Sequence, residues 1–260
     1  MKGLRYGISD TLVLAKRSLL RIPRQPDLLV GFTVQPILFV LLFVYVFGGA
    51  VGLALPPGLT YVDFLIPGII VQSIVFGGFV TALGLADDLK KGLIDRFRSL
   101  PMTRSALLTG RTLGDVVTNS FQLVVMFSVG LLIGFNFSSS VGEVVAGIVL
   151  LLLIGYAFSW VFAFIGLSSS SPEAANAFGF TILFPVTFVS SAFVPVDTMP
   201  SWLQPIAEHN PFTYMVNAAR ALFLGIPAEN NVWLALAWTL GIIAVFAPLS
   251  AWKYRRVVAQ

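Results

Sequence analysis

The sequence predicts an all-α integral membrane protein with six transmembrane helices, organised as a single domain over residues 1–260. Only 11% of its residues are charged, against roughly 25% in an average soluble domain, and 57% are hydrophobic. A helix needs about 20 apolar residues to cross the hydrocarbon core. Six uncharged stretches are long enough, and they cover residues 28–62, 64–86, 116–142, 144–172, 174–196 and 230–252.

Before the first span, residues 1–26 predict an amphipathic helix that lies flat on the inner leaflet. Its apolar side chains fall in one sector of the helix, and its basic side chains lie outside that sector. Pro23 and Pro26 end the helix before the chain enters the membrane. Two roles remain open, a simple lipid anchor and an element that relays motion to the first span.

Aromatic side chains recur along the second and fifth spans, in a chain with 23 phenylalanines. Such side chains can form walls for a bulky apolar substrate. For any single ring, packing against lipid or against the protein core is the stronger expectation. The candidate substrate path consists of Gln72, Phe76, Phe79, Phe180, Phe184 and Phe188.

Residues 86–104 predict a helix outside the membrane, between the second and third spans. Four apolar residues at spacings of four, four and three form one face, Leu89, Leu93, Phe97 and Leu100. Charges of both signs surround that face, and Pro101 stops the helix. This pattern suits docking onto a cytoplasmic protein, and the alternative is a basic cytoplasmic loop that happens to be helical.

A polar stripe starts at the cytoplasmic end of the third span. It consists of Arg111, Asp115, Asn119 and Gln122, spaced four, four and three residues apart. Inside a membrane such a stripe should face protein or water. It can belong to a conduction path, or it can be structural, with hydrogen bonds between helices and an ion pair between Arg111 and Asp115. We expect the structural role.

Residues 198–229 predict a re-entrant helical hairpin at the outer surface, between the fifth and sixth spans. Pro211–Leu224 is mostly apolar, but its 14 residues are too few to cross the membrane. Asn210 can cap this helix, and Gly225 fits just past its end. The polar residues of this hairpin are Glu208, His209 and Arg220. They can form a proton relay or gate, or they can form an exposed polar rim in which Arg220 satisfies helix-end carbonyls. We expect the rim.

The basic residues predict the orientation of the chain. If six spans alternate in direction, 15 of the 16 basic residues lie on one side, and Arg220 lies on the other. The positive-inside rule makes the basic side cytoplasmic. We therefore expect a multi-pass protein of the plasma or inner cell membrane with both termini in the cytoplasm. Its net charge of +4 reflects topology and contact with membrane lipid, and no nucleic-acid partner is expected.

Several kinds of chemistry are excluded because their residues are missing. The chain has no cysteine and one histidine, so disulfides, thiolate metal sites and Ser-His chemistry within a span lack their parts. No GxxxxGK[ST] phosphate loop occurs either. We expect no cofactor or metal in this chain and no ATP hydrolysis by the chain alone, so it is not expected to be an enzyme.

Two stretches resemble the type-2 ABC transporter permeases, in particular the daunorubicin-resistance-type drug-export permeases. One is GLIDRFRSLPMTR, residues 92–104, with the residues that follow it up to Asp115; the other is NPFTYMVNAARALFLG, residues 210–225. The resemblance extends over the whole chain. It includes the interfacial helix, the six spans, the cytoplasmic helix and the outer hairpin.

The resemblance implies that residues 86–104 form a coupling helix, which sits in a cleft of a separate ATP-binding subunit. On this chain it assigns ATPase coupling to Asp88, Lys91, Gly92, Leu93, Asp95, Arg96, Phe97, Leu100 and Pro101. ATP and Mg are then bound by two copies of the partner subunit. A second permease copy, forming a homodimer, completes the exporter, and substrate moves outward between the two copies.

The sequence thus predicts the permease subunit of an ATP-driven ABC exporter. Its substrate is a hydrophobic drug, lipid or lipid-linked molecule that leaves the cytoplasm or the inner leaflet. The alternative is an ATPase-independent six-span secondary carrier or channel, for which a mid-span acidic residue that binds a proton or sodium ion is missing. An intramembrane protease lacks both a GxSxG motif and a histidine within a span.

Overall fold

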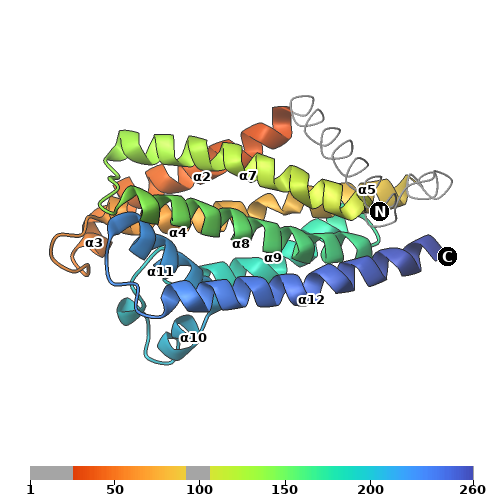
Figure 1. Ribbon diagram of the computed structural model, residues 1–260. Helices are drawn as coiled ribbons and strands as arrows, with labels where there is room; N and C mark the ends of the chain where they lie inside the picture. The colour runs from red at the N-terminus through yellow and green to blue at the C-terminus, as the bar shows by residue number, and fades with distance from the viewer. Residues whose placement is uncertain (1–25, 92–105, 260) are drawn as a thin grey trace.

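The computed structural model describes residues 26–91 and 106–259. Every regular element in these ranges is a helix, as predicted, and the long helices run side by side (Figure 1). In chain order the elements are α2 (Pro26–Leu42), the π-helical turn η2 (Phe43–Phe47), α3 (Gly48–Gly52), α4 (Tyr61–Gly77), α5 (Phe79–Lys90), α7 (Ala106–Ile133), α8 (Val141–Ser168), α9 (Pro172–Phe188), the 3₁₀ turn η3 (Val196–Thr198), α10 (Gln204–Glu208), α11 (Pro211–Leu224) and α12 (Asn231–Ala259).

Five stretches in the described ranges are long and apolar enough to cross a membrane: Val34–Gly52, Tyr61–Lys90, Leu108–Ile133, Val141–Ser168 and Asn231–Val257. The fifth predicted span, residues 174–196, corresponds to α9, which is shorter. Its 17 residues rise about 26 Å, less than the roughly 30 Å of the hydrocarbon core.

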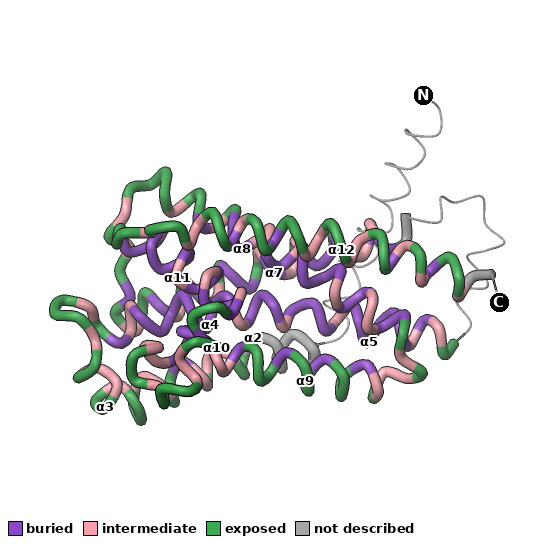
Figure 2. The backbone as a smooth tube through the Cα atoms, turned by 90° about the horizontal axis from the view of Figure 1, so that it is seen from below, coloured by how far each residue is buried: buried purple, intermediate pink, exposed green. Residues whose placement is uncertain are grey.

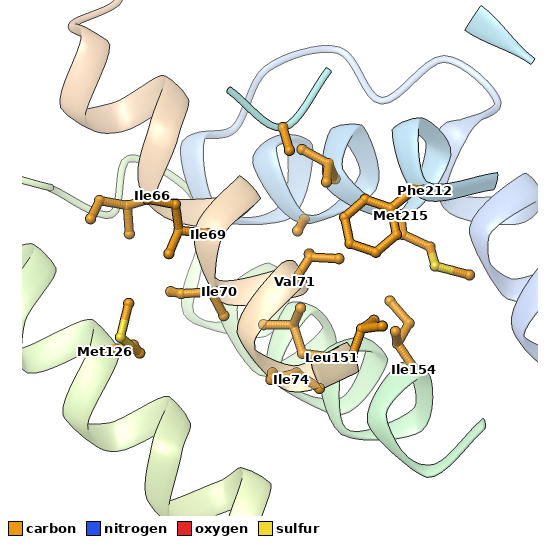
Figure 3. Close-up of a cluster of buried hydrophobic side chains, with 14 of the residues drawn as sticks. Ile66, Ile69, Ile70, Val71, Ile74, Met126, Leu151, Ile154, Phe212 and Met215 are labelled. Carbon is orange, nitrogen blue, oxygen red and sulfur yellow. The ribbon is translucent and has the colours of Figure 1, made fainter. Parts of the chain in front are cut away.

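α4 is the central helix of the described bundle, and it packs against α2, α7, α8 and α11. Figure 3 shows isoleucines of α4 in one buried cluster with Met126 of α7 and Leu151 of α8. α2, α9 and α12 lie at the periphery and expose much of their apolar surface (Figure 2). An apolar outer surface is what lipid or another membrane-embedded chain requires.

α7 begins at Ala106, so the helix extends beyond the uncharged stretch 116–142 and includes the whole polar stripe. The sequence places Arg111 and Asp115 at the cytoplasmic end of the third span. Both residues lie inside the helix, where each has a partner on α5. Arg111 pairs with Asp88, and Asp115 accepts a hydrogen bond from Thr81. Charges compensated in this way are compatible with a buried position.

α11 lies in the segment predicted to form the outer hairpin, and its two ends lie where the sequence predicts them. Asn210 Oδ1 accepts the Phe212 N–H at 2.8 Å, and Gly225 ends the helix with a φ of 66°. Asn210 Nδ2 also donates to the carbonyl of Val186, at 2.7 Å, and to that of Val189. One side chain therefore caps the start of α11 and the end of α9. The short helix α10 precedes α11 in the same segment.

Two predicted segments lie wholly or largely outside the described residues. Of the interfacial helix, residues 1–26, only Pro26 is described, and of the segment 86–104 only residues 86–91 are described. The end of α5, the start of α7 and the end of α12 lie at one end of the bundle, and α3, α11 and the start of α12 lie at the other (Figure 1).

Candidate functional site

The aromatic residues of the candidate substrate path meet where α9 packs against α4 and α5. Phe76, Phe79 and Phe180 form a triangle of rings, with centroid distances of 5.5, 5.6 and 5.0 Å. Offset and tilted rings at such distances attract one another beyond simple burial. The consecutive helices α4 and α5 therefore share one aromatic contact with α9, which is distant in sequence.

The remaining members of the path lie farther along the same junction. Gln72 Nε2 donates to Thr187 Oγ1 at 3.4 Å, and the rings of Phe184 and Phe188 stack at 4.2 Å. We call the full set the α9 strip, which consists of Gln72, Phe76, Phe79, Phe180, Phe184 and Phe188. The structure places these six residues in three separate contacts along the junction: the ring triangle, the Gln72–Thr187 hydrogen bond and the Phe184–Phe188 stack.

The α9 strip has a buried edge and an open edge. Phe79 is 2% exposed, whereas Phe180 and Phe184 are 38% and 44% exposed. The strip offers flat apolar surface and one amide but no ionisable group, so it can bind a bulky apolar molecule by burial and stacking. Within the described ranges, no group of three or more His, Asp or Glu side chains could hold a metal ion.

The aromatic contacts continue from the strip to the first span through two residues that the sequence analysis missed. Phe193 stacks on Phe188 at 4.7 Å and on Phe43 at 4.8 Å. Phe43 is the first residue of the π-helical turn η2, and π turns often occur at functional sites. No local sequence signal marks Phe43 or Phe193 among the many phenylalanines, because the contact joins residues distant in sequence.

The polar stripe of the third span faces α5 and α8. Arg111 Nη1 donates to Asp88 Oδ2 at 2.7 Å, and Thr81 Oγ1 donates to Asp115 Oδ2 at 2.6 Å. Asp115, Asn119 and Gln122 are all less than 10% exposed. The ion pair envisaged between Arg111 and Asp115 is thus replaced by a pair with α5, because Asp115 is already held by a hydroxyl.

Gly84 makes room for the ion pair between α5 and α7. A Cβ atom at residue 84 would lie 1.5 Å from Arg111 Nη2. The guanidinium therefore passes directly over the backbone of α5 on its way to Asp88, one helical turn farther along. A side chain at residue 84 would displace it and leave the carboxylate without its cation.

Asn119 is enclosed between two glycines from different helices. A Cβ atom on Gly77 would lie 2.5 Å from Asn119 Oδ1, and one on Gly155 would lie 2.3 Å from Asn119 Nδ2. Both polar atoms of this amide are buried without a hydrogen-bond partner in the structure. Close packing of α4, α7 and α8 thus depends on the absence of side chains at both glycines.

Two members of the predicted coupling set are described, and they differ in exposure. The side chain of Asp88 is 8% exposed and is paired with Arg111, whereas Lys91 is 61% exposed and is paired with Asp87 at 2.7 Å. The other seven members, Gly92, Leu93, Asp95, Arg96, Phe97, Leu100 and Pro101, lie outside the described residues.

The polar residues of the outer hairpin do not form one rim. Glu208 and His209 are exposed, but Arg220 is only 3% exposed. The expectation that Arg220 belongs to an exposed rim was wrong. Its expected bonding to carbonyls after a helix end is present, because Nη2 donates to the carbonyls of Ser191 and Ala192 at 2.6 and 3.2 Å.

Comparison with known proteins gives a consistent result over nearly the full chain. Residues 9–224 match the ABC-2 type transporter family. The chain is 36% identical to the daunorubicin resistance ABC transporter permease protein DrrB1 of Streptomyces coeruleorubidus, over 96% of this chain and 87% of that protein. It is 26% identical to the probable doxorubicin resistance ABC transporter permease protein DrrC of Mycobacterium tuberculosis, over 97% and 90%. The probable multidrug ABC transporter permease YbhR of Escherichia coli is 25% identical, over 78% and 55%.

Proposed function

Because the chain belongs to the ABC-2 type transporter family, we propose that it is the permease subunit of an ATP-driven exporter. It is a multi-pass membrane protein, and its relatives are permeases named for drug resistance or multidrug transport. The family match over residues 9–224 is the observation that carries the proposal. The energy for transport would come from ATP hydrolysis in another subunit.

The proposed substrate is a hydrophobic drug, lipid or lipid-linked molecule that leaves the cytoplasm or the inner leaflet. The α9 strip supports this class because it offers aromatic rings and no formal charge. Its open edge, at Phe180 and Phe184, faces outward from the protomer, where a molecule dissolved in the membrane can reach it. A charged hydrophilic substrate would find no counter-charge along the strip.

We propose that α9 completes a sixth crossing together with the residues that follow it. α8 ends at the same end of the bundle as α5 and α12, and α12 starts at the opposite end (Figure 1). The chain must therefore travel the length of the bundle between Ser168 and Asn231, and α9 is the long helix in that interval. Six crossings keep Lys90, Lys253 and Arg255 on one side, which the positive-inside rule makes cytoplasmic.

The proposed partner is a separate ATP-binding subunit, present in two copies, that binds ATP and Mg. It would dock on residues 88–101, between α5 and α7, through the apolar face of Leu93, Phe97 and Leu100. Asp88 has a different proposed role, because its carboxylate is directed to Arg111. It would anchor the docking segment to α7, so that movement of the segment is transmitted to the third span.

A second copy of the permease is proposed to pair through the face that contains α2 and α9. Large apolar side chains are exposed along α2, the adjoining η2 and α9. Leu38 is 58% exposed, Tyr45 is 75%, Phe178 is 60% and Ile182 is 55%. A homodimer formed through this face would bring the two α9 strips toward each other across one interface.

The first test is to purify the tagged protein in mild detergent from its native membrane and to identify co-purifying proteins by mass spectrometry. We expect a stoichiometric subunit that contains a GxxxxGK[ST] phosphate loop. ATP-dependent transport should then require both proteins after reconstitution. Transport by the permease alone would contradict the proposal and favour a secondary carrier or channel.

Leu93→Asp and Phe97→Asp test the docking segment. We expect both variants to insert normally and to lose the ATP-binding subunit, since a carboxylate would replace the apolar contact. Leu53→Asp is the matched control, because Leu53 is 90% exposed at the opposite end of the bundle. Normal assembly and export by the Leu93 and Phe97 variants would refute the assigned docking surface.

A further inference from the structure

Arg220 is a buried cation that has only neutral partners. All three of its nitrogen atoms donate hydrogen bonds. Nε bonds to the Phe64 carbonyl at 2.8 Å, and Nη1 bonds to Ser191 Oγ at 3.2 Å and to Asn217 Oδ1 at 3.1 Å. Nη2 bonds to the carbonyls of Ser191 and Ala192. No carboxylate in the described ranges forms an ion pair with it.

These five hydrogen bonds use all five N–H groups of the guanidinium, so Arg220 has no donor left for a ligand. Its guanidinium also lies 3.5 Å from the ring centroid of Phe64, which supplies a cation–π contact. The acceptors come from three places, namely α4, the turn that follows α9, and α11 itself. Arg220 therefore joins these three parts of the chain at the outer end of the bundle.

Two further contacts hold the same turn against α4. A Cβ atom on Gly68 would lie 2.3 Å from the carbonyl oxygen of Ala192, so the turn touches the backbone of α4. The Tyr61 hydroxyl donates to the carbonyl of Phe193 at 3.0 Å. The main-chain carbonyls of three successive residues, 191–193, thus all accept hydrogen bonds, and these bonds do not depend on the side chains of the three residues.

Fixing these carbonyls determines where the Phe193 ring lies. The ring is 4% exposed and is stacked between Phe188 on α9 and Phe43 on η2. Within Val34–Gly52, Val40 is the one fully buried apolar residue, and the stack adds a contact between this stretch and α9. Phe193 therefore joins the first span to α9, next to Phe188 at the end of the α9 strip.

We propose that Arg220 is the positioning residue of an outer closure, in which it holds residues 191–193 on α4 so that Phe193 seals the gap between Phe43 and Phe188. The inference rests on the proposed export function, because a closure is needed only if substrate leaves along the α9 strip. Opening would require the turn to leave α4, which breaks the hydrogen bonds of Arg220 together. Lysine cannot replace it, since an ammonium lacks the planar fork that spans several acceptors.

The chain has no cysteine, so introduced cysteines report on this contact without background from the chain itself. The test uses the full-length protein with Phe43→Cys and Phe193→Cys, and the measured quantity is the rate of copper-phenanthroline cross-linking in lipid nanodiscs. A second pair, Thr81→Cys with Asp115→Cys, monitors the opposite half of the bundle, where the native side chains are 2.6 Å apart. Neither measurement requires transport or a partner subunit.

We expect Arg220→Gln to slow cross-linking of the 43/193 pair by about tenfold or more, because several charge-assisted hydrogen bonds are lost at once. The 81/115 pair should cross-link at its original rate. Arg220→Lys should be intermediate. Arg256→Gln is the matched control, since Arg256 is exposed and lies over Trp252 at the other end, and it should change neither pair.

If Arg220→Gln does not yield folded protein, Tyr61→Phe removes only the hydrogen bond to Phe193 and should slow the 43/193 pair severalfold. Unchanged cross-linking of that pair in either folded variant would overturn the proposal. Equal slowing of both pairs would also overturn it, because Arg220 would then stabilise the whole bundle. Failure of ATP-driven export would instead contradict the proposed function and leave the cross-linking result intact.

Discussion

Two ion pairs at the end of α5 have the same length but differ in burial. They allow the effect of burial on the coupling energy of an ion pair to be measured. Asp88 pairs with Arg111, and Asp87 pairs with Lys91, and in both pairs the nitrogen and oxygen atoms lie 2.7 Å apart. The side chains of the first pair are 8% and 13% exposed, and those of the second are 27% and 61% exposed. The two pairs should therefore contribute very different coupling energies.

The expected magnitudes follow from exposure. Breaking a fully buried pair by removing one partner costs about 3–5 kcal/mol, because a charge remains buried without compensation. Since Asp88 and Arg111 keep slight access to solvent, we expect a coupling energy of about 2–3 kcal/mol. The pair between Asp87 and Lys91 links residues four apart on an exposed helix surface, which gives about 0.3–0.5 kcal/mol.

Two double-mutant cycles measure these energies. One combines Asp88→Asn with Arg111→Gln, and the other combines Asp87→Asn with Lys91→Gln. The free energy of unfolding of each variant is obtained from reversible unfolding in mixed micelles, followed by the fluorescence of the five tryptophans. Because a cycle reports only the interaction between the two changed residues, other contacts of each side chain cancel.

The two coupling energies should differ by a definite ratio. The cycle at Asp88 should give at least roughly four times the coupling energy of the cycle at Asp87. Equal coupling energies would refute the role of Asp88 as a buried anchor. Asp88 would then be available for contact with the ATP-binding subunit. A larger coupling for the Asp87 cycle would contradict the arrangement of α5 and α7 itself.

Two further predictions concern packing and topology. Gly166→Ala should lower the melting temperature of the purified protein by several degrees, since its Cβ would lie 2.5 Å from the carbonyl oxygen of Ala82. Gly142→Ala in the same helix is the control, because its Cβ would meet nothing within 4 Å and should leave the melting temperature unchanged. Equal melting temperatures of the two variants would contradict the close contact of α5 and α8. A cysteine at Ser201 should react with an impermeant reagent only from outside intact cells, and a cysteine at Arg255 only after the cytoplasmic side is opened. Both cysteines reacting from one side would rule out a crossing by α12, and the reversed pattern would rule out the six-span orientation.

The parts of the fold that the sequence predicts are those with local signals. α11 begins after Asn210 and ends before Gly225 because a cap and a left-handed glycine act within one helical turn. The apolar crossings are predictable for a similar reason, since the hydrocarbon core acts on each stretch separately. Neither signal requires knowledge of which helix is the neighbour.

The ion-pair partner of Arg111 and the environment of Arg220 depend on residues that are distant in sequence. Arg111 is acceptable inside a membrane helix only because Asp88 and Gly84 from α5 are placed beside it. Arg220 is buried because carbonyl groups of Phe64 and Ser191 accept its hydrogen bonds. Main-chain carbonyls exist at every residue, so no sequence pattern distinguishes the few that are positioned to bind a guanidinium.

The candidate site also contains residues that the sequence alone does not identify. The sequence could select Phe180, Phe184 and Phe188, because they recur on one helix. It could not select Phe193, which lies after the end of α9, or Phe43, which faces Phe193 from a π turn. A substrate path is lined by periodic residues on regular helices, but its closure needs a contact that can break, and such contacts form where helices end. In the proposed closure, Phe43, Phe193 and Arg220 come from three separate parts of the chain, so no helical period predicts that they act together.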